Sequence, residues 1–147
     1  MAFRPRVVIV EDDPDILLVL RINLELAGFN TSLAADGATG LRRIESERPD
    51  LVLLDLMLPG LDGWSVLAEL GSRQDGPPVV VCSAKHGARD IERAERLGAT
   101  GFVTKPFQID RVIEVALETV QRHPVRGTRP DSEELPEGFP IAGIEPA

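Results

Sequence analysis

Cysteine, histidine and tyrosine are scarce in this 147-residue chain, which has one cysteine, two histidines and no tyrosine. The lone cysteine, Cys82, excludes an intrachain disulfide framework and suits a reducing compartment. So few thiols and imidazoles argue against a zinc site. Long apolar runs are also missing, so no segment spans a bilayer, and the first residues lack the pattern of a secretory signal. We therefore expect a soluble, cytoplasmic protein without a membrane partner.

Positive charge is in short supply as well. Lys and Arg number 16 against 24 Asp and Glu, which gives a formal net charge of -8 at pH 7. Because nucleic-acid binding needs clustered Lys and Arg against the phosphates, this balance argues against direct nucleic-acid binding by the chain. The length suits one domain with an appendage.

Five short apolar runs alternate with segments of helical periodicity. Strands are expected at residues 6–10, 29–34, 51–54, 79–82 and 101–104. Apolar residues recur at helical spacing over residues 14–27, 38–48, 63–71, 90–97 and 109–120. Strands that alternate with helices form parallel sheets whose right-handed crossovers put helices on both faces. The pattern therefore predicts an α/β fold with a five-stranded parallel sheet.

The central strand ends in a carboxylate. Residues 51–54 are all apolar, as in a parallel strand buried on both faces, and Asp55 follows directly. Pro59 and Gly60 then turn the chain away. Since ligands bind outside the carboxyl ends of strands in open α/β sheets, Asp55 is a candidate site residue. On its own, such an aspartate could equally cap a helix or form a turn.

Charged and polar residues follow other strands too. The first strand ends at the acids Glu11 and Asp12, the fourth at Ser83 and the fifth at Lys105. In a parallel sheet these residues meet Asp55 at one edge, where clustered carboxylates repel and raise one another's pKa. A hard divalent cation such as Mg2+ resolves that conflict, because it takes oxygen ligands. The pocket therefore points to phosphate chemistry.

Four motifs in order carry a resemblance to a known family. They are Glu11-Asp12 after an apolar strand, Asp55 in the run 51–63, Ser83-Ala84, and Thr104-Lys105-Pro106-Phe107. With these motifs, residues 6 to about 120 resemble the receiver domain of bacterial two-component response regulators. The resemblance implies a flavodoxin-like (βα)5 fold with strand order 2-1-3-4-5.

The resemblance also implies a magnesium site. Asp12 and Asp55 would bind Mg2+ through their carboxylates, and Glu11 would bind it through a water molecule. The backbone carbonyl of Met57 would complete the protein ligands. Mn2+ could substitute for Mg2+ in such an oxygen-rich site.

For the phosphoryl group, the resemblance implies that Asp55 is the phosphoacceptor, which attacks the phosphorus of a phosphohistidine. Lys105 would pair with the phosphoryl oxygens, and the Ser83 hydroxyl would move to hydrogen-bond to them. Phe102 takes the position of the family's switch aromatic. The bond between Lys105 and Pro106 is a candidate for the cis form.

The function implied is a phosphorylation-dependent signalling switch, which catalyses only its own phosphoryl transfer and slow dephosphorylation. A sensor histidine kinase or a histidine phosphotransfer protein would supply the phosphoryl group. The face made by the fourth helix, fifth strand and fifth helix would then change to regulate an unknown downstream protein. The sequence leaves undecided whether phosphorylation causes dimerisation, because residues 98–102 lack the acids typical of dimerising receivers with winged-helix output.

Two alternatives from other classes remain. One is a pseudo-receiver, a protein-binding module that never takes phosphate, although the set of pocket residues is complete. The other is a phosphohydrolase of the haloacid-dehalogenase type, which also uses a strand-end aspartate as nucleophile. That class needs a second Asp two residues on as general acid, and here the position holds Met57.

The composition changes after residue 123. Residues 124–147 hold five of the 12 prolines and show no periodicity, so we expect a linker or disordered tail after a receiver domain at 1–123. No output-domain pattern follows the last helix, which indicates either a stand-alone receiver or a chain that stops before such a domain. The acidic tail could bind a partner or cap the domain's own surface.

Overall fold

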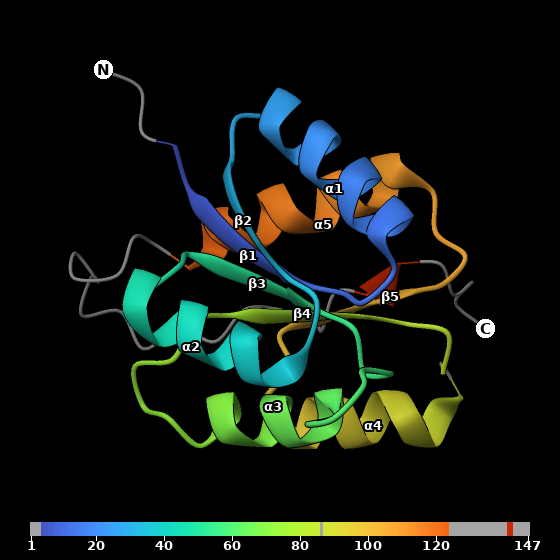
Figure 1. Cartoon of the computed structure of the whole chain (residues 1–147). Helices are drawn as coiled ribbons and strands as arrows, with labels where there is room; N and C mark the ends of the chain where they lie inside the picture. The colour runs from blue at the N-terminus through green and yellow to red at the C-terminus, as the bar shows by residue number, and fades with distance from the viewer. Residues whose placement is uncertain (1–3, 86, 124–140, 143–147) are drawn as a thin grey trace.

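The computed structural model describes residues 4–85, 87–123 and 141–142, and strands and helices alternate along them (Figure 1). The elements in order are β1 (Arg6–Val10), α1 (Pro14–Leu26), β2 (Asn30–Ala34), α2 (Gly37–Glu47), β3 (Leu51–Leu54), α3 (Gly63–Gly71), β4 (Val79–Ser83), α4 (Ala88–Arg96), β5 (Gly101–Thr104), α5 (Ile109–Arg122) and β6 (Ile141–Ala142). None of the helices in this described part combines the length and apolarity needed to cross a lipid bilayer.

The strands form one sheet in the order β2-β1-β3-β4-β5-β6, and every neighbouring pair is parallel. The predicted parallel sheet with order 2-1-3-4-5 is thus confirmed. The two residues of β6 add a sixth strand beside β5, within the segment expected to be a linker or tail. The rest of that segment lies outside the described residues, and the domain boundary at residue 123 stays a prediction.

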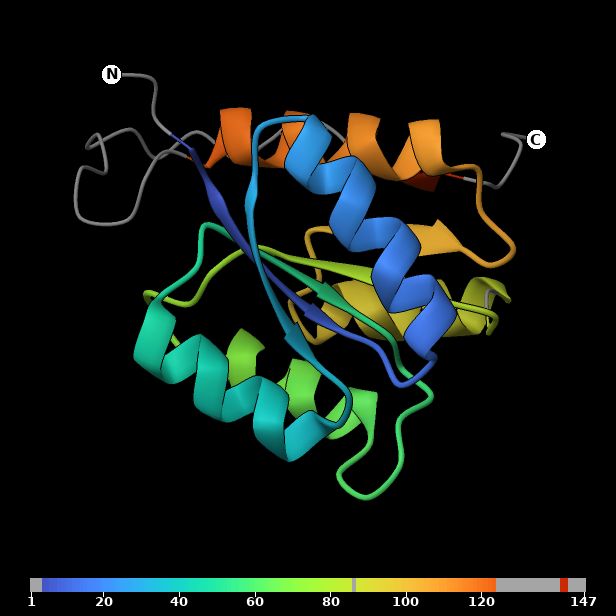
Figure 2. The same cartoon turned by 45° about the horizontal axis from the view of Figure 1, so that its top comes forward.

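Helices cover both faces of the sheet, α1 and α5 on one side and α2, α3 and α4 on the other (Figures 1 and 2). The strands supply both cores because successive side chains point to opposite faces. Val8 and Val10 of β1 belong to the core under α2, α3 and α4. Val7 and Ile9 belong to the core under α1 and α5. This two-sided burial explains why β1, β3 and β4 read as continuous apolar runs.

Aspartates begin three of the helices close to the carboxyl ends of strands. Asp13 accepts hydrogen bonds from the N–H groups of the first turn of α1, and Asp36 and Asp62 do the same for α2 and α3. Helix α4 has no side-chain cap and begins at Ala88, two residues before the expected start. The capped helices therefore start at fixed points beside the sheet edge, whereas α4 and α5 begin without a side-chain cap.

Gly63 fixes the path of the loop after β3. A Cβ atom at this position would overlap the backbone carbonyl oxygen of Asp55. The Gly63 N–H also donates to the carbonyl oxygen of Leu56, at 3.1 Å. Because only glycine allows this close approach, α3 begins directly against the residues that follow β3.

Candidate functional site

The register of β1 and β3 brings two acids side by side. Val10 lies opposite Leu54, so the next residues along the two strands, Glu11 and Asp55, are neighbours at the sheet edge. The Asp55 N–H donates to the carbonyl oxygen of Val10 at 3.0 Å, which extends the pairing by one residue. Glu11 and Asp55 are only 3% and 4% exposed. Two carboxylates are therefore held together away from bulk water.

A third carboxylate completes the acidic cluster. Glu11, Asp12 and Asp55 each offer a carboxylate oxygen, and these oxygens lie within 4.8 Å of one another. Asp12 is exposed, so the cluster opens to solvent on its side. Carboxylate oxygens are the ligands that Mg2+ prefers, and Mg2+ fills its remaining positions with water. The donor set present thus fits a hard divalent cation.

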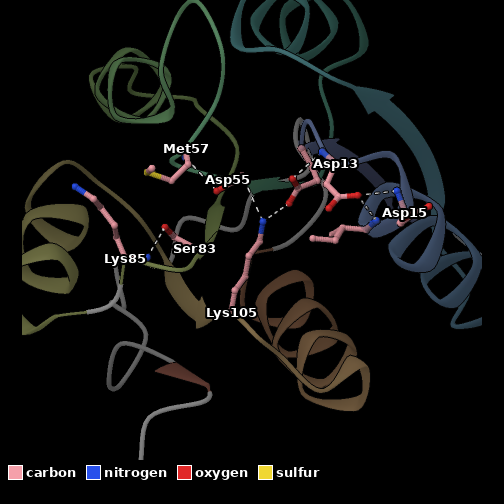
Figure 3. A network of polar contacts seen from close by, with 9 residues as sticks. Asp13, Asp15, Asp55, Met57, Ser83, Lys85 and Lys105 are labelled. Atoms are coloured by element: carbon pink, nitrogen blue, oxygen red, sulfur yellow. Dashed lines mark hydrogen bonds and ion pairs between the residues drawn. The ribbon is translucent and has the colours of Figure 1, made fainter.

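Lys105 reaches into this cluster from the end of β5 (Figure 3). Its Nζ donates to Glu11 Oε1 and to Asp55 Oδ2, the latter at 3.2 Å. The lysine side chain is 15% exposed, so the two ion pairs are largely shielded from water. Its peptide bond to Pro106 is cis. One ammonium group therefore serves two buried carboxylates and leaves the cluster with excess negative charge.

The electrostatics of the cluster follow from that imbalance. Burial raises the pKa of Glu11, and the charge of Asp55 raises it further, against the lowering effect of its hydrogen bonds from Lys105 and the Asp13 N–H. For Lys105, burial acts to lower the pKa, but the hydrogen bond to Glu11 and the charge of Asp55 outweigh it and the pKa stands above its usual value. The ammonium is held charged, while Glu11 ionises reluctantly.

Backbone N–H groups hold the other carboxylate oxygens. The Met57 N–H donates to Asp55 Oδ1 at 3.1 Å, and the Asp13 N–H donates to Glu11 Oε2 at 3.0 Å. Sequence reasoning assigned Met57 only a carbonyl ligand and did not foresee these contacts. The available signal was the spacing, since a carboxylate commonly accepts from the N–H two residues on at a turn.

Ser83 ends β4 next to β5, in register with Thr104. Its side chain is fully buried, and its Oγ accepts a hydrogen bond from the N–H of Lys85 at 3.1 Å. Figure 3 shows Ser83 and Lys85 on one side of Lys105, with Asp13 and Asp15 on the other. The hydroxyl therefore lies at the same sheet edge as Lys105, where it accepts a hydrogen bond from its own loop.

Phe102 lies one layer below the site. Its side chain is fully buried in the core under α2, α3 and α4, which also contains Ala94, the buried residue of α4. Arg93 of α4 stacks over the ring of Trp64 at the start of α3, 4.1 Å from the ring centroid. The shared core connects α4 to the sheet, and the Arg93–Trp64 stack connects it to α3.

Cys82 adjoins Ser83 in sequence but points to the opposite face of the sheet, into the core under α1 and α5. Burial there raises the pKa of its thiol to about 12. A thiol that stays protonated is neither a nucleophile nor a metal ligand at neutral pH. Cys82 therefore belongs to the core and not to the site.

Fold and pocket together define a doubly wound α/β domain with a cation-binding type of carboxylate cluster at its carboxyl edge. A family model described as the response regulator receiver domain matches residues 7–117. The chain belongs to this family, which confirms the resemblance seen in the four motifs.

Curated relatives are response regulators of about twice the matched length. The transcriptional activator protein IrlR of Burkholderia pseudomallei is 39% identical over 121 residues, which cover 82% of this chain and 52% of IrlR. The DNA-binding response regulator MtrA of Mycolicibacterium smegmatis is 41% identical over 105 residues, 71% of this chain and 46% of MtrA. The chain thus spans about half the length of these relatives.

A solved structure agrees with this assignment. The receiver domain of the Francisella response regulator 1452 superposes with a TM-score of 0.78 at 30% sequence identity, covering 81% of this chain and 98% of that domain. The architecture described above is therefore that of a receiver domain in its full extent.

Proposed function

We propose that this chain is a phosphorylation-dependent switch in which Asp55 accepts a phosphoryl group from a sensor histidine kinase or a histidine phosphotransfer protein. The observation that carries the proposal is the position of Asp55, buried between two further carboxylates and the ammonium group of Lys105. The role is signalling, and the chain acts on no substrate other than its own phosphoryl group.

The transfer uses groups that already surround Asp55. A carboxylate oxygen attacks the phosphorus, the bond from phosphorus to the donor imidazole nitrogen breaks, and its electron pair leaves with the imidazole. Lys105, 3.2 Å from Asp55 Oδ2, stabilises the oxygens of the group in transfer. Mg2+ or Mn2+, held by Glu11, Asp12, Asp55 and the Met57 carbonyl, would supply further neutralisation of those oxygens.

The response begins at the end of β4. The Ser83 hydroxyl exchanges its contact with the Lys85 N–H for a hydrogen bond donated to the new phosphoryl oxygens. Helix α4 follows this shift because it has few apolar anchors, with Ala94 as its one fully buried residue and Phe102 packed in the same core. The face formed by α4, β5 and α5 thereby changes shape, and two pre-existing forms shift in population.

A protein phosphodonor must dock beside the site, and exposed apolar side chains lie around it. Met57 and Leu61 are exposed on the loop after β3. Leu18 and Ile22 are exposed one turn apart on α1, which begins at the same sheet edge. We assign these residues to the docking surface for the donor, because the loop and α1 both follow strands that end at the edge carrying Asp55.

The downstream target is proposed to be a protein. Transcriptional activation and DNA binding stand in the names of relatives that are about twice as long as the region matched here. This chain has a net charge of -8, which is unsuited to phosphate contacts. We propose the cytoplasm as its compartment, in keeping with its single, unpaired cysteine.

Intact-protein mass spectrometry after incubation with acetyl phosphate and Mg2+ tests the assignment of Asp55. The wild-type chain is expected to gain one phosphoryl group, and chelation of the metal by EDTA is expected to prevent the gain. Asp55→Asn is expected to gain none, because the amide is no nucleophile.

Asp62→Asn is the matched control. It makes the same change in the same loop, and it leaves α3 capped because asparagine caps helices as well as aspartate does. A phosphoryl adduct on Asp55→Asn, or an adduct that forms equally in EDTA, would contradict the proposed function.

A further inference from the structure

The outer edge of β5 is covered by the chain's own C-terminal segment. Ile141 and Ala142 form β6 (red in Figure 1), which runs parallel to β5 with Ile141 opposite Phe102 and Ala142 opposite Val103. β6 also contacts α5. Without β6, β5 would be the edge strand and would present unpaired N–H and C=O groups on that side.

We propose that the β5 edge is a docking site for an extended segment, and that residues 141–142 of this same chain are its resident occupant. The covered edge is the middle of the face formed by α4, β5 and α5. The idea that β6 controls access to the target depends on the proposed function, since that face is where the switch would meet its target. The assignment of β6 as the occupant depends only on the strand pairing.

The pairing is of a kind that can be released. Main-chain hydrogen bonds give affinity in strand addition, and two residues supply few of them. Pro140, the residue before β6 in the sequence, has no N–H to donate to β5. The link through residues 123–140 raises the local concentration of the segment, so that so short a strand is held in place.

The position of β6 also connects it to the switch. Phe102 pairs with Ile141 through its backbone, while its side chain packs in the core that contains Ala94 of α4. A partner that adds its own strand to β5 must therefore displace β6. A partner that moves α4 disturbs the strand with which β6 pairs.

Amide hydrogen exchange of residues 101–104 in the unphosphorylated chain of residues 1–147 tests the occupant. The double variant Ile141→Pro/Ala142→Pro removes both N–H groups of β6, so the donor to β5 is lost whichever residue supplies it. We expect exchange of 101–104 to accelerate about tenfold, which matches the loss of one or two edge hydrogen bonds. Exchange in β1 and α5 serves as the check that the variant is folded.

The control is Ile144→Pro/Glu145→Pro, which makes the same chemical change in the same segment outside β6 and should leave 101–104 unchanged. Equal exchange of 101–104 in wild type and the β6 variant would overturn the proposal. Protection in wild type that falls on dilution would also overturn it, because the strand would then come from a second copy. The measurement needs no phosphate, so its outcome is independent of the test on Asp55.

Discussion

Charged residues of the same kinds meet at both ends of the sheet under different burial. At the carboxyl end, Lys105 joins Glu11 and Asp55, and none of the three side chains is more than 15% exposed. At the amino end, Arg6 and Arg43 share Glu47 at 3.7 and 3.6 Å, with both arginines 47% exposed. Water and salt screen the exposed pairs, whereas a buried carboxylate depends on its partner. The difference shows that burial, and not the number of ion pairs, makes the charged groups at the carboxyl end depend on one another and suits them to chemistry.

The largest effect should come from Lys105→Met, which leaves two buried carboxylates without their ammonium. In EDTA we expect a loss of about 3 kcal/mol in the free energy of unfolding, the low end for breaking a buried pair. Mg2+ should make the loss in the free energy of unfolding smaller, because the cation binds the folded cluster and neutralises the carboxylates in place of Lys105. Urea unfolding with and without Mg2+ measures both effects.

Lys85→Met is the matched control, since Lys85 also follows a strand at this edge but is exposed. It should change the free energy of unfolding by less than about 0.5 kcal/mol. Equal losses for the two variants would show that the Lys105 ion pairs are no better shielded than a surface lysine.

Glu11→Gln should have a smaller effect that depends on pH. The folded protein holds the pKa of Glu11 above its usual 4.5, chiefly by burial. The stability from this group is therefore complete below pH 4.5 and is lost as the pH rises through the folded pKa. In EDTA, the free energy of unfolding of the variant should increase relative to that of wild type as the pH rises from 4.5. Urea unfolding at several pH values measures this difference.

A difference between Glu11→Gln and wild type that stays flat with pH would contradict the raised pKa of Glu11 and the burial that causes it.

The smallest effect should come from the amino end. Arg43→Ala removes one partner of Glu47 and should cost less than about 0.5 kcal/mol, as for other exposed pairs. That cost should vanish at about 1 M salt, because ions screen charges that lie in water. Urea unfolding at low and high salt checks this. A cost that persists at high salt would remove the contrast with Lys105.

Much of the site was predictable because it depends on strand ends. Parallel strands deliver their last residues to one edge, so Asp55 and Lys105 were expected at the same edge once the alternation of strands and helices was recognised. β4 separates their strands, and the long lysine side chain spans that distance. The register that places Glu11 beside Asp55 follows from the same pairing. These positions depend on topology, which apolar periodicity reports well.

Other features depend on backbone detail that periodicity does not report. The N–H groups of Met57 and Lys85 reach the side chains two residues earlier only because of how each loop turns. The β6 pair is too short to show a period, and it forms because β5 offers a free edge. The early start of α4 at Ala88 lacks a capping side chain that would have marked it.

Cys82 gives the protein a practical property. It is the single cysteine in the chain, it lies 3% exposed in the core, and its pKa is about 12. The folded protein should therefore behave toward maleimide dyes as if it contained no cysteine. A cysteine introduced on the outer surface of α4 would be the one position that takes a label, and a fluorophore there could follow the motion of that helix without any background to engineer away.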